Sequence, residues 1–160
     1  MSELKTKGKI TMKGKILSLN ISEKKGQRKR AVNQAVLKEN YGIVGDGHAS
    51  DKWHRQISLL AMESIQKMID LGLKVGPGDF AENITTQGID LISLKVGTSL
   101  MAGDSIELEI SQLGKVCHTR CAIYYQAGNC VMPEEGIFAK VIRGGTLKPG
   151  DIIKIMEQGL

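Results

Sequence analysis

The most reactive side chains of this sequence lie together in one short stretch. The segment GKVCHTRCAIYYQAGNC, residues 114–130, holds all three cysteines of the chain and one of its three histidines. A cysteine thiolate is both a nucleophile and a soft metal ligand. The stretch therefore permits three interpretations: a metal site, a reactive thiol, or the packing of small apolar side chains.

Ligand counting argues against a metal site in this stretch. A structural zinc ion normally has four ligands, usually supplied as two close pairs. Cys117, His118 and Cys121 form one close group, but Cys130 has no close partner in the sequence. The segment would have to fold back on itself to complete a site, so a zinc-stabilised interaction module stays open only as an alternative.

Cys117 has the most basic surroundings of the three thiols. Lys115, His118 and Arg120 flank it, and positive or hydrogen-bond-donating neighbours favour the thiolate form. The sequence thus predicts a reactive thiol at Cys117. Cys121 and Cys130 are predicted to be small buried side chains.

A second polar stretch, GDGHASDKWHRQ at residues 45–56, is too irregular for a strand or a helix. A loop of this composition can present Asp46, His48, His54 and Arg55 to a ligand. The alternative is an ordered loop whose histidines bond to backbone carbonyls. The spacing of the two histidines fits neither helical metal ligands nor a zinc finger.

A third polar stretch, GPGDFAEN at residues 76–83, begins with a turn signal. Phe80 is predicted to enter the core, while Glu82 and Asn83 stay polar. These two side chains can either bind a ligand or satisfy neighbouring backbone groups.

The overall composition limits the class of protein. A chain of 160 residues fits one domain, and we expect residues 1–12 to be a flexible N-terminus. The formal charge of +5 is concentrated in KTKGKITMKGK and EKKGQRKR, but few aromatic residues are available to stack on bases. No apolar run has the length of a secretory signal or a membrane span. We therefore expect a cytoplasmic protein with neither nucleic acid nor membrane as a partner.

Short apolar runs between glycine-containing turns favour an α+β domain that is mostly β, with an antiparallel barrel or rolled sheet. Strands are predicted over 14–22, 30–39, 104–113 and 151–157. One helix is predicted over 58–73, capped by Ser58 and ended by Gly72. The stretches VGTSLMAGDSIELEI and GGTLKPGDIIKIM share a pattern that predicts two similar hairpins.

Four segments together resemble a MOSC domain, the module named for the C-terminal region of molybdenum cofactor sulfurases. They are GDGHASDKWHRQISLLAMESI, GPGDFAENITTQGIDL, VGTSLMAGD and the long segment from GKVCHTRC to KPGD. The order and spacing of these segments carry the resemblance, which is closest to the small free-standing bacterial members.

The resemblance implies a single MOSC domain over residues 1–160, with a β-barrel of mainly antiparallel strands and a few short helices. It implies that Cys117 carries sulfur as a persulfide or ligates the metal of a bound molybdenum cofactor. The residues implied in binding this cofactor, molybdopterin, are Asp46, His48, His54, Arg55, Glu82, Asn83, Lys115 and His118. Arg55, with Arg28 or Lys29, would hold its phosphate.

The resemblance also implies partners. These are molybdopterin, a molybdoenzyme or a protein of cofactor biosynthesis, with a cysteine desulfurase as the sulfur donor. No lysine motif for pyridoxal phosphate is recognisable, so we expect no pyridoxal phosphate site on this chain. The alternative activity is a small molybdenum-dependent reductase of N-hydroxylated compounds, in which Cys117 is the metal ligand.

Overall fold

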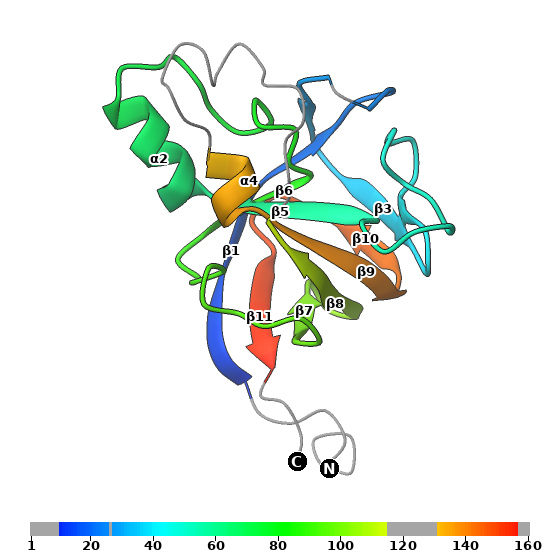
Figure 1. Cartoon of the computed structure of the whole chain (residues 1–160). Coiled ribbons are helices and arrows are strands. Elements are labelled where there is room, and N and C mark those ends of the chain that lie inside the picture. Colours follow the sequence, from blue (N-terminus) through cyan, green and yellow to red (C-terminus); the bar gives the residue numbers. More distant parts are fainter. Residues whose placement is uncertain (1–9, 26, 115–130, 157–160) are drawn as a thin grey trace.

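A computed structural model describes residues 10–25, 27–114 and 131–156 (Figure 1). The strands are β1 (Ile10–Ile21), β2 (Arg30–Val32), β3 (Ala35–Lys38), β4 (Gly42–Ile43), β5 (Ile57–Ala61), β6 (Ile84–Gln87), β7 (Ser99–Ala102), β8 (Ile106–Leu113), β9 (Ile137–Arg143), β10 (Gly145–Leu147) and β11 (Ile152–Met156). The helices are α2 (Met62–Asp70) and α4 (Val131–Glu135).

The main sheet closes on itself. Its strands are hydrogen-bonded in the order β11, β7, β8, β9, β5, β6 and β1, and β1 pairs back with β11. β2 adds to the outside of this ring through β1. Every pairing is antiparallel except that of β5 with β6, so the prediction of a mostly β, mainly antiparallel barrel is confirmed. Closure leaves few edges open to another chain.

Alternation of apolar and polar residues fills the barrel. In β8, Ile106, Leu108 and Ile110 are buried while Glu109 is exposed, as predicted. Two clusters of buried side chains result: a large one inside the ring of strands, and a smaller one that includes Ile65, Met68 and Phe80. The smaller cluster packs α2 and α4 against the outside of the barrel, and the prediction for Phe80 is confirmed.

The predicted helix over 58–73 begins too early. Residues 57–61 form β5, and all five are buried because this strand lies between β9 and β6. Ser58 caps no helix, since α2 starts after Ala61 without a side-chain cap. The C-terminal boundary is close to the prediction, with Gly72 in the left-handed region at φ +99°. Pairing within the barrel outweighs the local helical pattern at residues 58–61.

Two other predictions also need correction. The predicted strand over 30–39 divides into β2 and β3, which belong to different sheets, since β3 pairs with β4 and β10. The β7–β8 hairpin exists as expected. Its supposed counterpart does not, because β10 pairs with β3 while β11 pairs with β7 and β1. Similar turn sequences thus join a paired hairpin, β7–β8, and two strands that do not pair with each other, β10 and β11.

Residues 10–12, predicted to be flexible, form the start of β1 and face β11. Within the described ranges, no helix is long and apolar enough to span a membrane.

Candidate functional site

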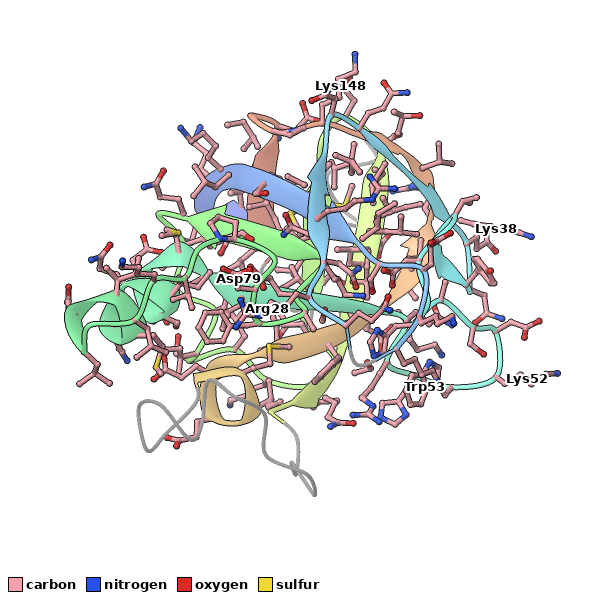
Figure 2. The ribbon with its side chains drawn as sticks, turned by 90° about the horizontal axis from the view of Figure 1, so that it is seen from above. Arg28, Lys38, Lys52, Trp53, Asp79 and Lys148 are labelled. Carbon is pink, nitrogen blue, oxygen red and sulfur yellow. The ribbon has the colours of Figure 1, made fainter. Side chains whose placement is uncertain are left out.

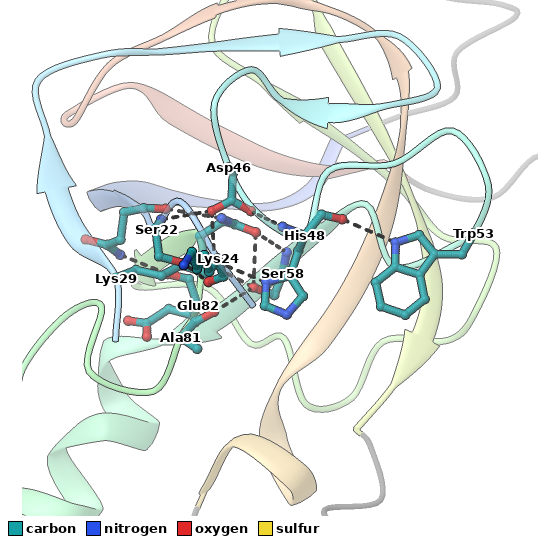
Figure 3. A network of polar contacts seen from close by, with 11 residues as sticks. Ser22, Lys24, Lys29, Asp46, His48, Trp53, Ser58, Ala81 and Glu82 are labelled. Carbon is teal, nitrogen blue, oxygen red and sulfur yellow. Dashed lines mark hydrogen bonds and ion pairs between the residues drawn. The ribbon is translucent and has the colours of Figure 1, made fainter. Parts of the chain in front are cut away.

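The loop that joins β4 to β5 holds the polar residues singled out in the sequence (Figure 3). Its first part is fixed to the end of β1: the N–H of Gly47 donates to the carbonyl of Ser22 at 2.7 Å. A Cβ on Gly47 would lie 2.7 Å from the carbonyl carbon of Lys24. Glycine is therefore required for this close approach, which sets Asp46 and His48 beside the β1–β2 connection.

Asp46 and Lys29 form an ion pair that is removed from solvent. Lys29 Nζ lies 2.8 Å from Asp46 Oδ1, and both side chains have 0% relative exposure. The backbone N–H of Ser22 donates to Oδ1 and that of His48 to Oδ2, both at 3.1 Å. Burial by itself would raise the pKa of Asp46. The hydrogen bond from Lys29, the two backbone donors and the ammonium charge together outweigh burial and hold this pKa below its ordinary value.

Lys29 uses its ammonium group entirely within the protein. Besides Asp46, it contacts Ser22 Oγ at 3.0 Å and His48 Nδ1 at 3.2 Å. Because the group is buried and has three partners, it lacks the access to hold a phosphate, the role suggested for it by the sequence. The side chain of Arg28 is 56% exposed, and its Nη1 lies 4.0 Å from Asp79 Oδ1 (Figure 2).

Trp53 organises the second part of the loop. Its Nε1–H donates to the carbonyl of His48 at 3.2 Å, and the two rings are parallel within 2°. Lys25 Nζ and Arg55 Cζ each lie 4.4 Å from the centre of the Trp53 ring, and Arg55 Cζ lies 5.3 Å from that of Phe138. Positive groups from two separate segments of the chain thus lie over the indole ring of Trp53.

His54 joins the loop to the end of β8. Its Nε2 lies 2.6 Å from Gln112 Oε1, and its carbonyl accepts the hydroxyl proton of Ser111. Gln112 in turn donates through Nε2 to the carbonyl of Gly114 at 2.8 Å. His54 is therefore anchored at the point where β8 ends.

The same point is also where the chain returns to the barrel. The N–H of Gly114 donates to the carbonyl of Gly136 at 2.7 Å, and Leu113 pairs with Ile137. The segment that begins after Gly114 and ends at Gly136 is thus tied together at its base. Cys117, Lys115 and His118 belong to this segment but lie outside the described residues, as do Cys121 and Cys130.

Glu82 and Asn83 form a separate buried cluster below the loop. Glu82 accepts hydrogen bonds from Gly78 N at 2.8 Å, Phe80 N at 3.3 Å and Thr85 Oγ1 at 2.7 Å. Burial raises the pKa of Glu82, and these donors offset only part of that rise. Because its oxygens are occupied by neighbouring groups, we infer that Glu82 supports the fold. Its predicted role in cofactor binding stays a prediction.

Asn83 joins three segments of the chain. Its Oδ1 accepts from the N–H of Ser58 at 3.0 Å and from its hydroxyl at 3.2 Å, while its Nδ2 donates to the carbonyl of Asn20 at 3.1 Å. These contacts match the structural alternative stated for this residue from the sequence.

Sequence reasoning missed two residues that shape the loop. Ser22 holds Asp46 and Gln112 holds His54. It named Lys29, but for a phosphate and not as the partner of Asp46. Gln112 had a detectable signal, because it is a polar residue at the end of a strongly patterned strand, directly before the cysteine-containing segment. Among the residues that the structure describes, no group of three or more His, Cys, Asp or Glu side chains could hold a metal ion.

Comparison with known families identifies the domain. A family model for the MOSC domain matches residues 44–154, which is more than half of the chain. The chain belongs to the MOSC domain family. The loop 45–56, the turn 76–83 and strands β5 to β10 lie within the matched range, which ends inside β11. A search of curated proteins gave no match.

Solved structures share the MOSC fold of this chain. The YuaD protein of Bacillus subtilis is 20% identical with a TM-score of 0.74, and the alignment covers 92% of this chain and 98% of YuaD. YiiM of Geobacillus stearothermophilus is 19% identical with a TM-score of 0.67, over 92% and 77% of the two chains. YiiM of Escherichia coli is 16% identical with a TM-score of 0.66, over 92% and 71%. At these identities the similarity extends to the fold.

Proposed function

We propose that this MOSC domain binds molybdopterin, with or without its metal, and carries or receives sulfur on Cys117. The observation that carries the proposal is the anchoring of His54 to the end of β8 through Gln112. It brings the polar loop 45–56 to the base of the segment in which Cys117 follows Gly114 by three positions. A ligand held by the loop would therefore lie near the base of that segment.

The basic side chains around Trp53 suit an anionic ligand. Lys25, from the β1–β2 connection, and Arg55, from the loop, contact the ring of Trp53, and neither forms an ion pair with a described residue. To a phosphate, the guanidinium of Arg55 would offer two parallel donors. When bound, the cofactor would supply a dithiolene and, in its metal form, a metal ion able to take a soft ligand.

Within the proposal, Cys117 supplies the sulfur chemistry. Its thiolate attacks the outer sulfur of a donor persulfide, for which a cysteine desulfurase is the expected source. The S–S bond of the donor breaks, the donor thiolate leaves, and Cys117 becomes a persulfide. Alternatively, the same thiolate ligates the cofactor metal as a soft donor.

The test is the intact mass and the molybdenum and molybdopterin content of protein purified without oxygen. The wild-type chain is expected to carry the mass of one additional sulfur atom, or bound cofactor. Cys117→Ala should lose both, because the nucleophile and the soft ligand are gone.

Cys121→Ala is the matched control, since it removes a thiol from the same segment. It should behave like the wild type. If Cys117→Ala keeps both its cofactor content and its extra sulfur, the proposal is wrong.

A further inference from the structure

The ammonium group of Lys29 has one acceptor for each of its three protons. These are Asp46 Oδ1 at 2.8 Å, Ser22 Oγ at 3.0 Å and His48 Nδ1 at 3.2 Å. Ser22 can accept because its own hydroxyl proton is donated to the carbonyl of Lys24 at 2.9 Å. An ammonium group donates only, so the contact with His48 requires a lone pair on Nδ1.

His48 is held at three further points. Its N–H donates to Asp46 Oδ2, its carbonyl accepts from Trp53 Nε1, and its ring is parallel to that of Trp53. A half-turn of the ring about its Cβ–Cγ bond would place Cδ2 instead of Nδ1 against the ammonium group, and the contact with Lys29 would be lost. Figure 3 shows Lys29 from the β1–β2 connection beside Asp46 and His48 from the loop between β4 and β5.

We propose that Lys29 is a positioning residue that holds His48 as a single neutral tautomer, with its proton on Nε2. A proton on Nδ1 would set an N–H against the ammonium group, in a contact that has no acceptor. In this tautomer Nε2–H can only donate. Asp46 compensates the charge of Lys29, so the ion pair serves the orientation of this imidazole.

The proposal defines what His48 can bind. With Nδ1 occupied and Nε2 protonated, the ring has no lone pair for a metal ion. A cofactor atom that met Nε2–H would have to be an acceptor, such as an oxygen or ring nitrogen of the pterin or an oxygen of its phosphate. This extension to the cofactor rests on the proposed function, whereas the tautomer does not.

The test is the pair of ¹⁵N chemical shifts of the His48 ring, measured in the full chain without cofactor. The spectra are recorded at pH 8, where an ordinary imidazole is neutral. In the wild type, Nδ1 should resonate as an unprotonated nitrogen and Nε2 as a protonated one. In Lys29→Met/Asp46→Asn, which removes both charges and so avoids an unpaired buried ion, the two shifts should move toward each other as the tautomers exchange.

Two controls separate this effect from a general disturbance. Lys24→Met removes an exposed positive charge from the same segment and should leave the His48 shifts unchanged. The ring of His54, which is anchored by Gln112, should keep its shifts in every variant.

A protonated Nδ1 in the wild type would overturn the proposal without any variant. Unchanged His48 shifts in the folded double variant would overturn the role of Lys29. Because no cofactor is present, neither result depends on whether the chain binds molybdopterin.

Discussion

Asp46 and Glu82 are both buried carboxyl groups, yet their surroundings differ in one decisive respect. Asp46 faces the ammonium of Lys29 at 2.8 Å. Glu82 faces backbone N–H groups and the hydroxyl of Thr85 but no cation among the described residues. The pKa of Asp46 is consequently lowered and that of Glu82 is raised. Hydrogen bonds from neutral groups alone do not offset the burial of Glu82.

The two carboxyl groups also serve different parts of the chain. Asp46 holds an irregular loop, and its partners orient the ring of His48. Glu82 holds the turn before β6, where Ala81 has a left-handed φ of +64° that is unfavourable for a residue with a Cβ. The carbonyl of Ala81 accepts from Ser58. The ion pair thus belongs to the candidate site, while the hydrogen-bonded cluster around Glu82 keeps the turn at Ala81 in place.

The largest expected effect comes from breaking the ion pair. Lys29→Met or Asp46→Asn alone should lower the free energy of unfolding by about 3–5 kcal/mol, because each leaves an unpaired buried charge. The double variant should lose clearly less than the sum of the two single losses. Urea unfolding of the four proteins measures this coupling.

The exposed pair of Lys67 and Glu135 provides the control for that cycle. Its N–O distance is 2.7 Å, but the side chain of Lys67 is 57% exposed. Lys67→Met should therefore change the free energy of unfolding by no more than about 1 kcal/mol. Additive losses at Lys29 and Asp46, similar in size to that at Lys67, would show that the buried pair is not special.

A smaller effect is an opposite dependence on pH. The stabilising contribution of Asp46 is present above its ordinary pKa of 3.8 and is lost as pH falls through the lowered value. The contribution of Glu82 is present below its ordinary pKa of 4.5 and is lost as pH rises through the raised value. The loss of stability in Glu82→Gln should therefore shrink as pH rises from 4 to 7.

This dependence is measured by urea unfolding at several pH values. The stability difference between the wild type and Lys29→Met/Asp46→Asn should shrink as pH falls below about 4. A Glu82→Gln difference that is constant with pH would contradict the raised pKa of Glu82.

The family pattern predicted the barrel, and the alternation of Ile106, Leu108 and Ile110 predicted β8. The shared turn pattern did not predict the pairing of β10 and β11. Similar local turns lead to different strand pairings once the barrel closes. Residues 58–61 show the same limit, since burial between two strands overrides their helical spacing.

The candidate site was predicted in part. Asp46, His48, His54 and Arg55 do lie in one irregular loop, as their composition indicated. The burial of Lys29 was not predictable, because it lies in the run EKKGQRKR and its partner Asp46 is 17 residues away. Nothing local distinguishes this lysine from its exposed neighbours. Lys29 becomes buried because the end of β1, the loop 45–56 and the turn at residues 76–83 come together around it in the fold.

The most direct test of the account is the molybdopterin content of two folded variants purified in parallel with the wild type. Lys29→Met/Asp46→Asn should retain about tenfold less cofactor than the wild type, as is typical when the groups that orient a binding residue are removed. Glu82→Gln should retain cofactor close to the wild-type level although it is less stable. Equal retention in the double variant and the wild type, or a greater loss in Glu82→Gln, would contradict the division between an ion pair that serves the site and a hydrogen-bonded cluster around Glu82 that serves the fold.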